Sequence, residues 1–192
     1  MGLLGGSFNP AHSGHLHISR EAIKRLKLDE VWWLVSPQNP LKAQQGMASL
    51  QTRLRDAQVV AKDRRIRVTA LESLLGTQYT VESLEQLLKR FPGRHFVWLM
   101  GADNMVQISR WQDWPQIFHQ LPVAVLARPS YSIRASSSKA AVRFRRRRLS
   151  GARARGLALW PVPAWALLRI KLSKLSATGL RQARIGQTVS PR

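Results

Sequence analysis

The five consecutive apolar residues Val31-Trp32-Trp33-Leu34-Val35 limit most strongly what this chain can fold into. Because no polar side chain interrupts the run, a strand made from it has no face suited to water. Such strands are typical of the interior of a parallel sheet, which is buried on both faces. Parallel strands are joined by crossover connections, usually helices. The run therefore favours an α/β fold.

Extended and helical patterns alternate along the rest of the chain. The expected strands are residues 1–4, 31–35, 66–70, 95–100, 123–127 and 165–172. Helices are expected from Gly14, from Leu50, from Thr80 as an N-cap, over residues 114–120, and over 176–185 at the C-terminal end. The alternation predicts one α/β domain over residues 1–192, with a doubly wound, Rossmann-like parallel sheet. Ligands bind beyond the carboxyl ends of the strands in such sheets, which places residues 5–15 and 101–104 at one edge.

Composition narrows the class of protein further. The 192 residues are 44% hydrophobic and include no cysteine, so disulfides, thiolate metal sites and cysteine nucleophiles are excluded. The start of the chain lacks the basic and long apolar segments of a signal peptide. The most apolar late segment, residues 157–168, contains two prolines and is shorter than the roughly 20 residues of a membrane span. We expect a cytoplasmic protein that does not cross a membrane.

Positive charge is concentrated in the last third of the chain. The net charge is +21, and residues 131–192 hold 15 basic and no acidic residues. Residues 130–156 read as a basic insertion, either a basic helix or a mobile loop, in which residues 143–155 include seven arginines. A charge run is usually a solvated surface, but a field of this sign also attracts nucleotides and nucleic acids. A nucleic-acid-binding arm is therefore one alternative function.

The segment that follows the first expected strand carries the strongest chemical signal. It reads Gly5-Gly6-Ser7-Phe8-Asn9-Pro10-Ala11-His12-Ser13-Gly14-His15. A glycine-rich turn lets the backbone approach a ligand, and a helix N-terminus favours an anion. His12 and His15 are spaced to share one side of the first helical turn, where each imidazole can donate to phosphate oxygens. A zinc half-site is the alternative for such a pair, but no further ligand cluster stands at metal spacing.

These residues resemble the signature of the His-x-Gly-His nucleotidyltransferase superfamily. Further stretches are similar to the nicotinate-nucleotide adenylyltransferase family, in the same order and with similar spacing from residue 2 to about 184. They are residues 36–42 (SPQNPLK), 79–84 (YTVESL), 101–104 (GADN) with Trp111, Trp114 and Ile117, and 176–181 (SATGLR). Two positions depart from the family pattern, since Ala177 replaces a serine and Ser83 a threonine.

The resemblance implies the roles of individual residues. His12, His15 and Arg181 would be catalytic. The ATP site would comprise Gly6, Ser7, Phe8, His12, Gly14, His15, Gly101, Asp103, Ser176, Thr178 and Arg181. The acceptor would contact Asn9, Lys42, Thr80 and Trp111, with Trp111 stacking on the pyridine ring. Simpler interpretations exist for three of these: an N-cap for Asp103, an N-cap for Ser176 and a solvated side chain for Lys42.

The reaction that the resemblance implies is adenylyl transfer from ATP to nicotinate mononucleotide, which gives nicotinate adenine dinucleotide and pyrophosphate in NAD biosynthesis. Mg²⁺ would arrive on the phosphates of ATP, because the acidic residues form no carboxylate cluster in the sequence. The alternative acceptor within the superfamily is pantetheine phosphate. Whether nicotinamide mononucleotide also reacts depends on which N–H groups face the ring substituent.

Overall fold

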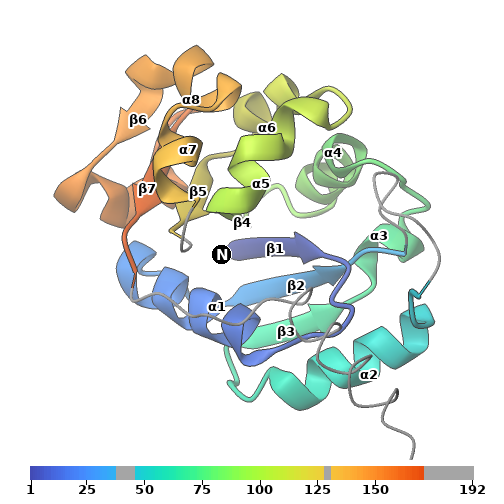
Figure 1. Cartoon of the computed structure of the whole chain (residues 1–192). Helices are drawn as coiled ribbons and strands as arrows, with labels where there is room; N and C mark the ends of the chain where they lie inside the picture. Colours follow the sequence, from blue (N-terminus) through green and yellow to red (C-terminus); the bar gives the residue numbers. More distant parts are fainter. Residues whose placement is uncertain (38–45, 128–130, 171–192) are drawn as a thin grey trace, which may run out of the picture.

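In the part of the chain that the structure describes, seven strands form one parallel sheet, in the order β3-β2-β1-β4-β5-β7-β6 (Figure 1). The computed structural model describes residues 1–37, 46–127 and 131–170. The strands are β1 (Gly2–Gly6), β2 (Val31–Val35), β3 (Ile66–Thr69), β4 (Val97–Gly101), β5 (Val123–Leu126), β6 (Arg148–Leu149) and β7 (Trp165–Leu168). The strand order reverses between β1 and β4, which confirms the predicted doubly wound α/β fold.

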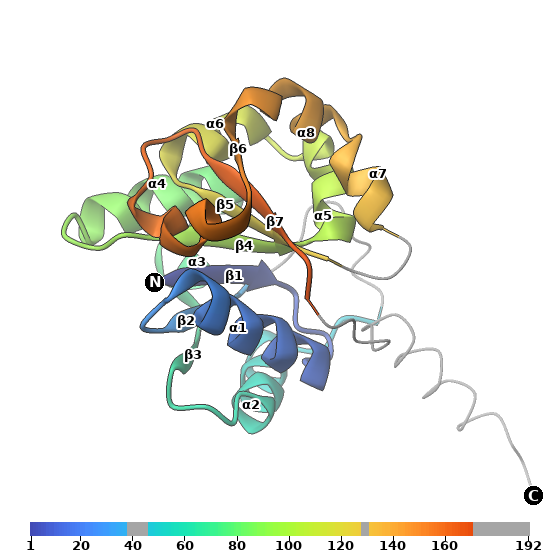
Figure 2. The ribbon, with the colours of Figure 1, turned by 90° about the vertical axis from the view of Figure 1, so that its left-hand side faces the viewer.

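Helices cover both faces of the sheet (Figures 1 and 2). One face packs against α1 (Ser13–Leu26), α2 (Leu50–Val60) and the 3₁₀ segment η3 (Gly151–Leu159). The other carries α3 (Leu71–Leu74), α4 (Thr80–Arg90), α5 (Ala102–Gln107), η1 (Ile108–Arg110), α6 (Trp114–Gln120), α7 (Ser132–Ser136) and α8 (Lys139–Arg143), while η2 (Arg145–Arg147) leads from α8 to β6. None of the helices in the described part of the chain has the length and apolarity to cross a bilayer.

Each face of the sheet has its own apolar core because side chains alternate along a strand. In β4, Val97 and Leu99 point into the core under α1, whereas Trp98 and Met100 point into the core under α4 to α6. All four side chains are buried. The run of apolar residues in β4 is therefore required by burial on both sides, as the sequence predicted for β2.

The first strand is longer than expected. Gly5 and Gly6 are the last residues of β1 and pair with Leu34 and Val35 of β2, so they are not turn residues. The reason for Gly5 is close packing, since a Cβ there would lie 2.4 Å from the Trp98 side chain of the neighbouring strand. The predicted glycine turn is wrong for these two residues, and the turn begins at Ser7.

Helix α4 also begins differently from the prediction. Thr80 is its first helical residue, and Tyr79 occupies the N-cap position. The Glu82 carboxylate accepts the backbone N–H groups of Gln78 and Tyr79, each at 3.3 Å. The predicted N-cap role of Thr80 is therefore wrong: the extended backbone lies one residue earlier, at Tyr79 (φ −109°, ψ 145°), and Glu82 holds that residue there.

The basic insertion is part of the folded core over its described residues, and it contains short helices and an edge strand. Neither the single basic helix nor the mobile loop that the sequence suggested describes it. Apolar residues between the arginines explain this: Phe144 stacks on Phe118 with ring centroids 4.5 Å apart, and Trp165 Nε1 donates to the Phe144 carbonyl at 2.9 Å. Strand β6 then pairs in parallel with β7.

Candidate active site

The carboxyl ends of β1 and β4 place two of the predicted motifs side by side. The strands are neighbours in the sheet, with Leu3 opposite Trp98 and Leu4 opposite Leu99. Residues 7–15 follow β1 and residues 102–104 follow β4 at the same edge of the sheet. Segments that lie almost a hundred residues apart in sequence are thereby brought together, as the fold prediction required.

The turn after β1 is held by the ring of Phe8. This residue has a left-handed backbone conformation (φ 46°), which is uncommon for a residue with a side chain. Its ring is buried and stacks on Trp33 of β2, with centroids 5.1 Å apart and planes at 20°. Packing of the ring therefore stabilises a left-handed backbone conformation that is more usual for glycine.

His12 and His15 form a reciprocal cap at the N-terminus of α1. The backbone N–H of Gly14 donates to Nδ1 of His12 at 3.1 Å, and the backbone N–H of His12 donates to Nδ1 of His15 at 3.2 Å. A ring nitrogen that accepts a hydrogen bond carries no proton, so each neutral ring carries its proton on Nε2. The ring centroids lie 3.9 Å apart, which confirms the predicted shared side of the helix. His12 is buried and His15 is half-buried.

A chain of hydrogen bonds supports His15 from the core. Trp33 Nε1 donates to the Ser19 hydroxyl, which in turn donates to the His15 carbonyl, both at 2.8 Å. Phe8 also packs against the His15 ring, with centroids 4.8 Å apart. The sequence reasoning missed Trp33 and Ser19 as supports for the site. Ser19 could have been recognised from its place on the buried side of α1, because a buried hydroxyl requires a hydrogen-bond partner.

Arg53 of α2 is a further residue that the sequence reasoning missed. Its side chain is only 2% exposed, and its guanidinium donates to the carbonyl oxygens of Ser7, Ser36, Pro37 and Ala48. Burial lowers the pKa of Arg53, but a guanidinium remains charged in proteins. Its position was visible in the sequence, because an arginine stands on the apolar side of a helix between Leu50 and Ala57.

Asn9, predicted to contact the acceptor, links two segments of the chain. Its Nδ2 donates to the Gly46 carbonyl at 3.1 Å, and its Oδ1 accepts the backbone N–H of Ala48 at 3.3 Å. The described contacts thus join the turn after β1 to the segment that leads into α2. They leave the predicted contact with substrate untested.

The β4 side of the edge contributes Gly101 and Asp103. Gly101 is buried as the last residue of β4 and occupies the N-cap position of α5, with half-buried Asp103 in the first turn. The N-cap interpretation of Asp103 is therefore wrong.

Thr80 and Trp111, two of the predicted acceptor contacts, are half-buried. Trp111 and Trp114 both pack against the core on the face of the sheet that α4 and α6 cover. This position was expected for Trp114.

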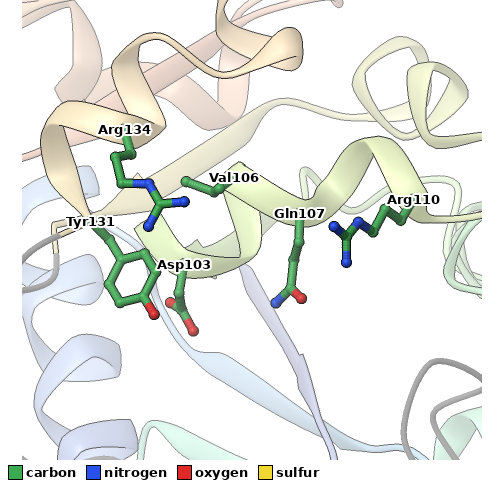
Figure 3. Close-up of a pocket in the computed structure, with 6 residues that line it drawn as sticks. All are labelled: Asp103, Val106, Gln107, Arg110, Tyr131 and Arg134. Carbon is green, nitrogen blue, oxygen red and sulfur yellow. The ribbon is translucent and has the colours of Figure 1, made fainter.

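A cavity of about 290 Å³ adjoins Asp103. Its lining comes from two segments: Asp103, Val106, Gln107 and Arg110 from α5 and η1, and Tyr131 and Arg134 from the start of α7 (Figure 3). The Arg134 guanidinium lies 5.9 Å from the centre of the Tyr131 ring. Among the described residues, two guanidinium groups and one carboxylate border this cavity, an arrangement suited to a polar ligand with negative charge.

Four predicted site residues, Lys42, Ser176, Thr178 and Arg181, lie outside the described residues, as does the expected helix over residues 176–185. Within residues 1–37, 46–127 and 131–170, no group of three or more histidine, aspartate or glutamate side chains is placed to hold a metal ion.

The sequence matches a family model and many curated proteins. Residues 3–182 match the model described as cytidylyltransferase-like. The chain is 49% identical to a probable nicotinate-nucleotide adenylyltransferase of Methylorubrum extorquens, over 94% of this chain and 98% of that protein. It is 50% identical to a protein of the same name from Parvibaculum lavamentivorans, over 95% of this chain and 90% of that protein.

A solved structure shares the fold. The Plasmodium falciparum nicotinic acid mononucleotide adenylyltransferase complexed with NaAD superimposes with a TM-score of 0.72. The two chains are 17% identical, and the match covers 94% of this chain and 82% of the other. At that identity the likeness supports the architecture alone.

Proposed function

The chain belongs to the cytidylyltransferase-like family and has nicotinate-nucleotide adenylyltransferase activity, and from this premise we propose how its residues carry out the reaction. A phosphate oxygen of nicotinate mononucleotide attacks the α-phosphorus of ATP. The bond between the α-phosphorus and the oxygen that joins it to the β-phosphorus breaks, and pyrophosphate leaves with the electron pair of that bond. Because a phosphate nucleophile is already ionised near neutral pH, the protein needs to supply positioning and charge stabilisation rather than a general base.

The reciprocal cap of His12 and His15 is the observation that carries this proposal. Because Nδ1 of each ring accepts a backbone N–H, the proton of each neutral ring is on Nε2, and an Nε2–H group is a donor suited to phosphate oxygens. Both donors stand at the N-terminus of α1, whose 14 residues give a dipole favourable to an anion. We propose that they bind the phosphates of ATP and stabilise the charge that develops on the leaving pyrophosphate.

The neighbouring backbone completes the proposed triphosphate site. Gly6 ends β1, and the backbone N–H groups of Ser7 and Phe8 in the turn that follows are proposed to donate to the phosphates. The buried Gly14 contributes no side chain at the start of α1. On the β4 side, Gly101 and Asp103 are proposed to face the ribose. The proximity of the ends of β1 and β4 supports both assignments.

Thr80, Trp111 and Asn9 are the proposed contacts of the acceptor among the described residues. Lys42, Ser176, Thr178 and Arg181 remain predictions from the motifs at residues 36–42 and 176–181. Mg²⁺ is proposed to arrive with ATP, because phosphate oxygens are the ligands that this hard cation prefers. The cytoplasm, where ATP and a pyridine mononucleotide meet, is the proposed location.

A coupled assay of acceptor choice tests the proposal. Purified protein is incubated with ATP, Mg²⁺ and, in turn, nicotinate mononucleotide, nicotinamide mononucleotide or pantetheine phosphate, and pyrophosphate release is measured. We expect fastest turnover with nicotinate mononucleotide, with nicotinate adenine dinucleotide as the second product. Preferential turnover of pantetheine phosphate would contradict the proposed acceptor site.

A further inference from the structure

We infer that Arg53 is a positioning residue for ATP: by binding carbonyls of the two loops that leave β1 and β2, its guanidinium sets the orientation of the backbone at the proposed phosphate site. The inference rests on the proposed function of the turn after β1. Arg53 acts through the backbone, since its described partners belong to the protein.

The hydrogen bonds of Arg53 reach three separate segments of chain. Nη1 donates to the Ser7 carbonyl at 2.8 Å and to the Ser36 carbonyl at 2.7 Å. Nη2 donates to the Pro37 carbonyl at 2.8 Å, and Nε donates to the Ala48 carbonyl at 2.9 Å. The planar fork of a guanidinium suits this task, because its donors point in fixed and different directions. One side chain therefore fixes the ends of β1 and β2 relative to each other and to α2.

The bond to Ser7 has a direct consequence for the phosphate site. The peptide group is planar and trans, so its C=O and the following N–H point in opposite directions. When the Ser7 carbonyl points at Arg53, the N–H of Phe8 must point away from it. The amide of Phe8 is one of the proposed phosphate donors. Arg53 therefore decides which way that donor faces.

Other contacts make this anchor rigid. Helix α2 is capped by the Ser49 hydroxyl, which accepts the Thr52 N–H at 3.1 Å, and Ala57 packs in the core one turn beyond Arg53. The Ser36 N–H and hydroxyl both donate to the Gly6 carbonyl, at 3.0 and 3.3 Å. The loops that Arg53 joins are thus already adjacent, and the guanidinium adds the constraint on peptide orientation. Lysine cannot replace it, because one ammonium nitrogen cannot reach all of these carbonyls.

Steady-state kinetics of Arg53→Lys and of a matched control test the inference. Arg55 lies on the exposed side of the same helix, so Arg55→Lys controls for a change of arginine to lysine in α2. We expect Arg53→Lys to raise KM for ATP about tenfold or more, because losing a hydrogen bond to a charged phosphate weakens binding by about that factor, with a smaller change in kcat. We expect Arg55→Lys to match the wild type in both constants.

The outcomes separate the inference from the function on which it rests. If the wild type forms no nicotinate adenine dinucleotide, the proposed function fails. If the wild type is active and Arg53→Lys loses thermal stability or kcat while KM for ATP is unchanged, Arg53 is only structural and the inference is overturned.

A measurement on the wild type covers the case in which Arg53→Lys does not fold. Amide hydrogen exchange is followed with and without ATP in residues 5–9, 34–37 and 47–53. If Arg53 couples these segments, ATP slows exchange in all of them together. Protection by ATP confined to residues 5–9 would overturn the inference.

Discussion

The imidazole rings of His12 and His15 lie with their centroids 3.9 Å apart, and the backbone N–H of His12 donates to the His15 ring. The first residue of the pair thus orients the second before any ligand is present. Such preorganisation means that no side-chain rotation is needed when charge develops on a phosphate. The cap and the proposed chemistry use different nitrogens of the same rings, so they can be separated by mutation.

Asparagine at either histidine should separate the two roles. An asparagine Oδ1 can accept the capping N–H in place of Nδ1, but the residue lacks the Nε2–H group. We expect His12→Asn and His15→Asn each to lower kcat by about 10²-fold while leaving the melting temperature near that of the wild type. Adenylyl transfer and thermal unfolding are measured on each variant. His17→Asn, on the same helix, serves as the control, and near-normal turnover in both test variants would remove the catalytic assignment.

Glutamine at His12 should have the opposite effect on the cap. Its amide nitrogen extends to the position of Nε2, but it leaves the Gly14 N–H without the acceptor that Nδ1 provides. We expect His12→Gln to destabilise the protein by about 1 kcal/mol, the usual cost of losing a helix N-cap. Chemical denaturation of His12→Gln and His12→Asn gives the comparison. Equal stability of the two would show that the cap contributes nothing measurable.

Glu72 should make the stability of the protein depend on pH. Burial raises the pKa of Glu72 from its usual value to about 7. The folded state then binds a proton more tightly than the unfolded state, so the free energy of unfolding falls as the pH rises from about 4.5 to 7 and stays lower above that range. The full decrease is about 3 kcal/mol at 1.36 kcal/mol per unit.

The variant Glu72→Gln tests this dependence, because it keeps the shape of the side chain and removes the titration. We expect the variant to gain stability relative to the wild type at pH 8 and to show no such gain at pH 4. Denaturation midpoints at both pH values provide the measurement. Glu85→Gln is the control, since Glu85 is exposed and pairs with Lys89 on the surface of α4. A gain that is the same at both pH values would argue against titration of Glu72.

The limits of sequence reasoning follow from the range of the interactions involved. Strand β2 could be predicted because burial on both faces requires an unbroken run of apolar residues, which is visible in the local sequence. The glycines of β1 could not be interpreted locally, since Gly5 is required by Trp98, which is far away in sequence. The place of Arg53 on the apolar side of a helix was visible in the sequence, but its role was not, because its carbonyl partners come together only after three segments fold. The pairing of His12 with His15 could be predicted because it lies within one helical turn.

Substitution of Gly5 should show how closely β1 and β4 pack. A Cβ at Gly5 would lie 2.4 Å from Cη2 of the buried Trp98 ring, so Gly5→Ala must displace the indole or the strand. We expect a loss of about 1 to 3 kcal/mol, as for overpacking of a core, measured by urea denaturation. Gly93→Ala is the control because the space around Gly93 is open. Equal stability of the two variants would contradict the close contact.

The basic insertion should contribute to stability through its apolar residues and not through its arginine run. Arg145, Arg146 and Arg147 are exposed, whereas Phe144 is buried and stacks on Phe118. We expect Phe144→Ala to lower the free energy of unfolding by about 3 kcal/mol or more, as removal of a core phenylalanine does. Replacing the three arginines together by glutamine should change it by less than about 1 kcal/mol and leave kcat and KM within about twofold of the wild type, since surface substitutions have small effects.

The same triple variant tests the alternative of a nucleic-acid-binding arm. If the arginines contact phosphates, wild-type affinity for single-stranded RNA falls steeply with salt, with a slope of about −0.7 per contact in a log–log plot. The triple variant would then show a slope smaller by about 2, because three contacts are lost. Equal slopes for the two proteins would mean that these arginines make no phosphate contacts. The arginine run leads into β6, the edge strand that pairs with β7, so we do not expect it at the active site. A loss of adenylyl transfer in the triple variant would contradict that expectation.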